Sequence, residues 1–345
     1  MRTEDFLKEI TKIRGLSGDE GLVSAWVAEQ FAPLCDEVTV DAMNNVVARK
    51  RGDGPRVMFS AHLDEIGLMV SLIEEDGSLR LGQVGGVDPR ILPGQRVTVY
   101  GVRALQGVVG AKPPHLLTAE DRKKNYQREE LYVDVGFPPD KVRGLVRVGD
   151  QVQLEHRHTD LLNGRVSVKT CDDRACVAAI YHALKMLQGQ PHEADLYFVA
   201  SSQEEVGARG AETGAFALEP DFAVALDVCH AETPGAPQGE TLRIESPAVG
   251  MGPYLHPVLR DKLLEVAREH NVQVQHEVMP RSTGTDADVI GVSRGGVPTA
   301  LLELPLKYMH TTVETLDMNA LKECGRLLAR FAAAVSPAWE DELWT

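Results

Sequence analysis

Residues 57–65 read Val-Met-Phe-Ser-Ala-His-Leu-Asp-Glu. A short apolar run followed directly by a histidine and two acids is typical of a strand buried on both faces of an α/β sheet. Similar runs predict strands at Leu196–Ala200, Phe222–Leu226, Val272–Val278 and Pro298–Leu304, and helical patterns lie at Arg174–Leu187, Pro257–His270 and Met318–Val335. Strands that alternate with helices predict an α/β domain, with a mixed or mostly parallel sheet that helices cover on both faces.

The segments before this strand predict a helix and a hairpin. Ser17 and Glu20 have the spacing of a capping box, and they precede the apolar run Leu22–Phe31. Two short valine-rich runs then flank Met43-Asn44-Asn45, which is typical of two strands joined by a turn.

The character of the sequence changes between Val70 and Leu162. Short β-rich runs are separated there by glycine and proline, and no convincing long helix is visible. The runs include Leu79–Gly82, Arg96–Tyr100, Gly107–Val109, Leu131–Val135 and Gln151–Leu154. We therefore expect residues 1–69 and 163–345 to form the α/β domain, and residues 70–162 to form an inserted domain, a small β-barrel or sandwich.

Charge and cysteine content restrict the partners and the compartment. The chain has 345 residues and a formal net charge of -15, which disfavours nucleic acid and anionic membranes, since both bind basic surfaces. No stretch of about 18 apolar residues is present, and the N-terminus lacks the apolar block of a signal peptide. The five cysteines include no C-x-x-C pair, so we expect a reducing compartment, the cytoplasm.

Five short clusters of acids and histidines follow predicted strands or begin a predicted helix. They are centred on His62 with Asp64, Asp172 with Asp173, Glu204 with Glu205, Asp227, and His310. Each has an ordinary structural interpretation as well: paired aspartates can cap a helix, paired glutamates can lie in a solvated loop, and a lone histidine can be a core residue. In an extended chain Asp64 points to the same side as His62 and can orient its ring.

Considered together, the clusters favour a metal site. Ligands of open α/β sheets bind beyond the carboxyl ends of the strands, where these clusters are expected. Imidazole nitrogens and carboxylate oxygens without thiolates suit Zn, Co or Mn. The sequence contains no H-E-x-x-H, no G-x-x-x-x-G-K-[ST] and no G-x-S-x-G, which argues against a helix-borne zinc site, a phosphate-binding loop and a serine hydrolase.

The motifs around these residues resemble the tetrahedral and glutamyl aminopeptidase family, some members of which carry an endoglucanase label. The strings that carry the resemblance are Ser60-Ala61-His62-Leu63-Asp64-Glu65-Ile66-Gly67, Asp172-Asp173-Arg174, Gln203-Glu204-Glu205-Val206-Gly207, Ala225-Leu226-Asp227-Val228, Gly284-Thr285-Asp286-Ala287 and Tyr308-Met309-His310. They occur in the family's order, and the match runs from the first helix to the last.

The resemblance implies an aminopeptidase that removes N-terminal residues from short peptides by two-metal hydrolysis, with Zn or Co as the metals and Mn also compatible. It implies five metal ligands, with Asp172 bridging both ions, His62 and Asp227 on one ion, and Glu205 and His310 on the other.

Two further roles follow from the resemblance. Glu204 would be the general base and Asp64 the acid that orients His62. The peptide bond between Asp172 and Asp173 is expected to be cis, and no other cofactor is expected.

The resemblance also implies a homo-oligomer, a hollow dodecamer built from dimers. Residues 70–162 would then be the dimerisation domain, since the exposed strand edges of a β-rich module need a cover. Two alternatives stay open. A glycosidase with paired carboxylates would not need His62 and His310, and a non-enzymatic scaffold would be expected to lack part of the ligand set.

Overall fold

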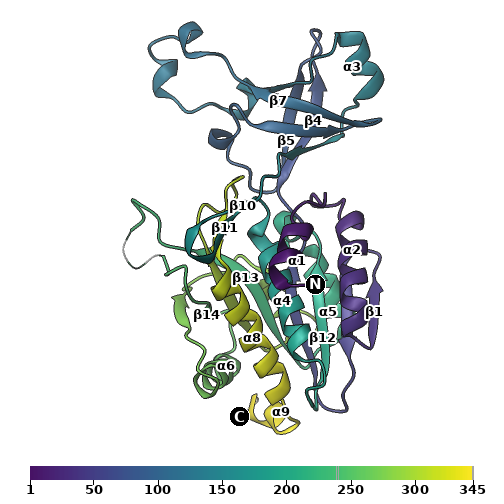
Figure 1. Ribbon diagram of the computed structural model, residues 1–345, viewed down its shortest axis with the longest axis vertical. Helices are drawn as coiled ribbons and strands as arrows, with labels where there is room; N and C mark the ends of the chain where they lie inside the picture. The colour runs from purple at the N-terminus through teal and green to yellow at the C-terminus, as the bar shows by residue number, and fades with distance from the viewer. Residues whose placement is uncertain (238, 240, 344–345) are drawn as a thin grey trace.

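The computed structural model describes residues 1–237, 239 and 241–343. Two parts lie one beyond the other along the long axis of the molecule (Figure 1). The larger part is an α/β sandwich formed by segments on both sides of the insertion, and the smaller part is a closed β-barrel. The predicted fold class is confirmed.

The central sheet is mixed, with the strand order β1-β2-β12-β3-β13-β16-β14-β15. In that order its strands are β1 (Glu37–Val40), β2 (Val46–Lys50), β12 (Asp195–Ser201), β3 (Arg56–His62), β13 (Phe222–His230), β16 (Thr299–Leu306), β14 (Ala248–Met251) and β15 (Gln275–Val278). The central strands β12, β3, β13 and β16 are parallel. Their carboxyl ends therefore meet at one edge of the sheet, where ligands of such sheets bind.

Helices cover both faces of this sheet. One face carries α1 (Thr3–Ile10), α2 (Gly21–Phe31), α4 (Cys171–Met186), α6 (Pro257–Glu269), α8 (Met318–Ala334) and α9 (Ala338–Leu343), and the other carries α5 (Arg209–Leu218) and α7 (Asp286–Ile290). In Figure 1, α4 and α8 lie side by side across the middle of the sheet. Every residue of β3 after Arg56 is buried, because water is excluded from both sides of the strand, and this explains its unbroken apolar run.

The barrel closes in the order β4-β5-β8-β7-β6-β9. Its strands are β4 (Gly67–Ile73), β5 (Leu79–Val84), β8 (Tyr132–Asp134), β7 (Ala104–Gly110), β6 (Arg96–Tyr100) and β9 (Gln151–Leu154), and a short helix, α3 (Pro139–Leu145), lies on it. Exposed and buried residues alternate along β7, as expected for a strand with one face toward the barrel interior. Closure leaves no free strand edge, so the expectation of exposed edges was wrong.

A small three-stranded sheet lies between the barrel and the sandwich. It pairs β10 (Thr159–Asp160) with β11 (Arg165–Ser167), and β11 with β17 (Thr315–Asp317). No described helix is both long and apolar enough to cross a membrane.

The capping box predicted at Ser17 and Glu20 does not form. The helix α2 begins at Gly21, and no side chain caps its N-terminus. Oγ of Ser17 donates instead to Oδ2 of Asp64 at 2.6 Å, and Glu20 accepts from the N–H of Gly18. A hydrogen bond to a buried carboxylate is stronger than one to a neutral helix terminus, so tertiary structure overrides the local signal.

Candidate active site

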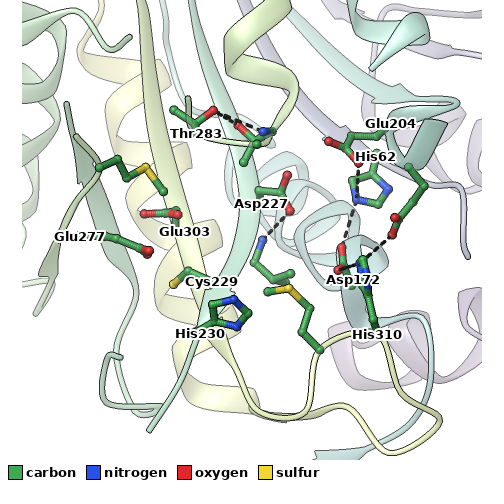
Figure 2. A pocket seen from close by; sticks show the side chains of 16 residues that line it. His62, Asp172, Glu204, Asp227, Cys229, His230, Glu277, Thr283, Glu303 and His310 are labelled. Atoms are coloured by element: carbon green, nitrogen blue, oxygen red, sulfur yellow. Dashed lines mark hydrogen bonds and ion pairs between the residues drawn. The ribbon is translucent and has the colours of Figure 1, made fainter. Parts of the chain in front are cut away.

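Four of the predicted site residues lie at the carboxyl edge of the central sheet, and three of them, His62, Glu204 and Asp227, are labelled in Figure 2. His62 is the last residue of β3, Glu204 and Glu205 follow β12, and Asp227 lies within β13. Because β3 pairs with both β12 and β13, their ends are neighbours. Residues separated by more than 160 positions in sequence thereby line one cavity.

Asp172 lies between the two histidines. It enters from the start of α4, and His310 enters from the loop between β16 and β17. Nε2 of His62 is 3.1 Å from Oδ1 of Asp172, and Nε2 of His310 is 3.2 Å from Oδ2. Nε2 of His310 is also 3.3 Å from Oε1 of Glu205. The peptide bond between Asp172 and Asp173 is cis, as predicted.

The contacts of Nδ1 in the two rings leave Nε2 of each ring facing Asp172. Nδ1 of His310 lies 3.0 Å from the carbonyl oxygen of Gly86, to which it can only donate. Nδ1 of His62 lies 3.4 Å from Oδ1 of Asp64. Nε2 is therefore the nitrogen that each ring turns toward Asp172, as in metal-binding histidines, and at that position it can carry a proton or bind a cation.

Asp64 is buried behind His62 and connects three parts of the site. Its carboxylate accepts from the backbone N–H of Glu204 at 3.0 Å and of Glu205 at 3.3 Å, and from Oγ of Ser17 at 2.6 Å. Burial alone would raise the pKa of Asp64, but His62 and these donors hold it below its usual value. Asp64 thus contacts both the imidazole ring of His62 and the backbone of the paired glutamates.

Two further acids accept hydrogen bonds from β3 and β12, the strands that lead into the site. Asp173 is fully buried, and it accepts from the backbone N–H of His62 through one oxygen at 3.2 Å. Asp286 accepts from Oγ of Ser60 at 2.7 Å and from Oγ of Ser201 at 2.5 Å. Burial raises the pKa of both carboxyl groups.

The pKa values of the site reflect buried acids that lie close together and form no ion pair with a described lysine or arginine. Burial raises the pKa of Glu204 to about 8, and it also raises the pKa values of Glu205 and Asp227. Hydrogen bonds to Asp172 and Glu205 raise the pKa of His310 to about 11. Within the described part of the chain, the ion pairs of these carboxylates involve histidine only.

This donor set fits divalent cations. The ligand atoms of His62, Asp172 and Glu205 lie within 4.8 Å of one another, and so do those of His62, Asp173 and Asp227. One oxygen of the buried Asp173 has no hydrogen-bond partner among the described residues. Imidazole nitrogens and carboxylate oxygens converge here, no described lysine or arginine forms an ion pair with them, and bound cations would balance the negative charge of the acids.

Sequence reasoning gave no role in the site to several residues that line or support the cavity. They are Ser17, Asp286, Cys229, Glu277 and Glu303. Glu303 was detectable in principle, because it is the one charged residue of the largely apolar strand β16, and acids are almost never fully buried unless they are paired.

The chain matches the family described as M42 glutamyl aminopeptidase over residues 44–327. It belongs to this family. Lysyl aminopeptidase of Pyrococcus furiosus is 38% identical over 339 residues, which cover 96% of this chain and 97% of the relative.

Solved structures agree with this assignment to the M42 family. Aminopeptidase APDkam598 from the archaeon Desulfurococcus kamchatkensis has a TM-score of 0.93 at 33% identity, with 99% of this chain and 98% of that chain covered. The Pyrococcus horikoshii TET1 peptidase, described as able to assemble into a tetrahedron or a large octahedral shell, has a TM-score of 0.86 at 30% identity, with 97% and 100% covered. This M42 peptidase is therefore an aminopeptidase, as the motifs predicted.

Proposed function

We propose that this M42 peptidase removes N-terminal residues from short peptides by metal-dependent hydrolysis with two divalent ions. The observation that carries the proposal is the position of Asp172. Each oxygen of its carboxylate faces Nε2 of a different histidine, at 3.1 and 3.2 Å. A carboxylate in this arrangement is suited to bridge two cations.

The proposed ligands follow from that position. Asp172 would be shared by both ions, and four side chains would complete the set: His62 and Asp227 for one ion, Glu205 and His310 for the other. Mixed imidazole and carboxylate ligands suit Zn or Co, and Mn is also compatible. When bound, the two ions would lower the pKa of a shared water molecule and polarise the scissile carbonyl.

The protein's own side chains handle the proton. Glu204 is placed beside the ligands, with Oε2 3.9 Å from Nε2 of His62. Its raised pKa of about 8 lies near neutral pH, as efficient proton transfer requires. We infer that Glu204 takes the proton of the attacking water and passes it to the leaving amine. Asp64 would keep the ring of His62 and the backbone of Glu204 in position through its contacts with both.

The proposal is tested by metal analysis and chelation. We expect two divalent ions per chain, loss of aminoacyl-p-nitroanilide hydrolysis in EDTA, and recovery with added Zn, Co or Mn. Full activity in protein that contains no metal would refute it. The glycosidase alternative predicts instead that cello-oligosaccharides are hydrolysed and that chelation has no effect.

We further propose that residues 70–162 are the dimerisation domain and that dimers build a dodecamer. The Pyrococcus horikoshii relative, which can form a tetrahedron, supports this. Large apolar side chains exposed on the barrel and its loops, among them Leu72, Val102, Val108 and Val148, also support it. A cytoplasmic location is consistent with five free cysteines.

Membership of the family does not determine which N-terminal residue is removed. The family description names a glutamyl aminopeptidase, and the Pyrococcus furiosus relative is a lysyl aminopeptidase. The residue that fits this enzyme must be inferred from its own cavity.

A further inference from the structure

A second group of ionisable side chains lines the same cavity, beyond the proposed metal ligands. Cys229, Glu277 and Glu303 offer ligand atoms within 4.8 Å of one another. Figure 2 shows Asp227 between this acidic cluster and the group formed by His62, Glu204, Asp172 and His310. The cavity that joins the two groups has a volume of about 410 Å³.

The central sheet determines where the acidic cluster lies. Asp227 of β13 is directly paired with Glu303 of β16, so their side chains project from the same face. Cys229 is two residues beyond Asp227 and points to that face as well. Glu277 enters from β15, at the edge of the sheet. Asp227 is therefore next to the cluster, and a group bound at Asp227 has the cluster as its neighbour.

The acids of this cluster lack a counter-charge. Glu303 is fully buried, its carboxyl group interacts with that of Glu277, and no other described group donates a hydrogen bond to it. Oε2 of Glu277 is also unpartnered, and no described lysine, arginine or histidine forms an ion pair with either glutamate. Burial and the neighbouring Glu277 hold the pKa of Glu303 well above its usual range.

An unpaired acid pair is costly in a folded protein, and a cation that enters the cavity would relieve that cost. We propose that the acidic cluster binds the terminal ammonium group of the substrate's first side chain, so that the enzyme prefers an N-terminal lysine. This inference rests on the proposed function, because it assumes that the substrate's first residue occupies this cavity.

The shape of the cluster favours an ammonium over a guanidinium group. Three acceptor atoms packed within 4.8 Å suit a compact point charge with three rotatable donors. A guanidinium group is a planar fork that needs parallel acceptors on one carboxylate. Met279 and Met309 also line the cavity, and their flexible thioethers can pack along the aliphatic part of a lysine side chain.

The first test compares two substrates that differ by a single charged group. Norleucine has the four carbons of the lysine side chain without the ammonium. We expect kcat/KM to be about 10–100-fold higher for lysyl- than for norleucyl-p-nitroanilide, the size of one charged hydrogen-bonded contact. In E303Q and in the less buried E277Q this ratio should fall toward one. Glu265→Gln, an exposed acid on α6 outside the cavity, should leave the ratio unchanged.

The second test does not depend on turnover. Binding of free L-lysine and L-norleucine to the metal-loaded enzyme is measured by calorimetry, and the metal content of wild type and E303Q is determined. We expect L-lysine to bind more tightly, E303Q to lose the difference, and both proteins to hold the same number of ions. Lysine-selective binding that E303Q abolishes would support the inference even if no anilide is cleaved, an outcome that refutes the proposed function alone.

Two results would overturn the inference while the aminopeptidase activity stands. One is cleavage of norleucyl-p-nitroanilide at least as efficient as that of the lysyl substrate, with equal binding of the two amino acids. The other is an additional metal ion in the wild type that E303Q loses, which would make the acidic cluster a metal site.

Discussion

At the scale of single residues, Asp64 and Glu204 form one hydrogen-bonded unit. The Asp64 carboxylate contacts the ring of His62 and accepts from the backbone of Glu204. The histidine and the glutamate therefore depend on the same buried oxygen atoms for their positions. Replacement of Glu204 should lower the rate of proton transfer, whereas replacement of Asp64 should disturb the position of His62. The two proposed roles can therefore be tested separately.

Glu204→Gln should leave the fold and the metal content unchanged and lower kcat by about 10²–10⁴-fold, because an amide cannot accept the proton. The measurement is the steady-state rate alongside metal analysis. Glu29→Gln, an exposed acid on α2, is the matched control. A kcat within a factor of two of wild type would reject Glu204 as the base.

Asp64→Asn should weaken metal affinity or lower activity by about 10–100-fold, the usual loss for a residue that orients a ligand. The amide nitrogen can no longer accept from His62 or from the backbone of the paired glutamates. Competition with a chelator gives the affinity, and Asp53→Asn, exposed in a loop, controls for the change of charge. Unchanged affinity and rate would show that Asp64 has no positioning role.

At the scale of elements, the buried strands and long helices were predictable, since a largely apolar run such as Val57–Ala61 has few alternatives to a strand covered on both faces. The convergence of His62 and Asp227 was also predictable, because parallel strands end at one edge. Side-chain contacts between segments that are distant in sequence were not predictable. Ser17 satisfied a local capping pattern, yet it bonds to Asp64, 47 residues away.

The acidic cluster shows the same limitation. Glu277 and Glu303 lie on β15 and β16, which are not neighbours, since β14 separates them in the sheet. Nothing in the spacing of two single glutamates indicates that their carboxylates meet. Their proximity depends on the strand order, which the pattern of apolar residues does not specify.

The loop between β5 and β6 shows how the inserted barrel contributes to the site. The carbonyl of Gly86 accepts from Nδ1 of His310 at 3.0 Å, and a Cβ at Gly86 would lie 2.8 Å from that nitrogen. A residue of the barrel thus orients a proposed metal ligand of the sandwich, and there is no room for a side chain at the contact.

Gly86→Ala should therefore displace His310 and lower metal affinity or activity by about 10–100-fold. Gly144→Ala is the matched control, because Gly144 lies on α3 of the same barrel and an added Cβ would meet nothing within 4 Å. Affinity for the ion assigned to Glu205 and His310 is measured by competition with a chelator. Equal behaviour of the two variants would show that the barrel does not position His310.

At the scale of the whole molecule, the barrel must be explained by something other than edge protection. It is closed, and its interior has its own apolar core, so it has no need to pair strands with another subunit. The exposed apolar side chains on its outer surface still need an explanation, since Val102 is 69% exposed and Val148 is 63% exposed. Burial of such side chains between subunits is the favourable term expected in a symmetric interface.

The active particle should accordingly have about twelve times the mass of the 37.7 kDa chain, measured by light scattering on protein with full peptidase activity. Val102→Asp with Val148→Asp should break the assembly, because a buried unpaired carboxylate opposes association. Val292→Asp, equally exposed but outside the barrel at 75%, should leave the mass unchanged. A fully active monomer would refute assembly, whereas a stable active dimer would refute only the dodecamer.

Enclosure of the active sites in the larger particle predicts that short peptides are cleaved and folded proteins are not.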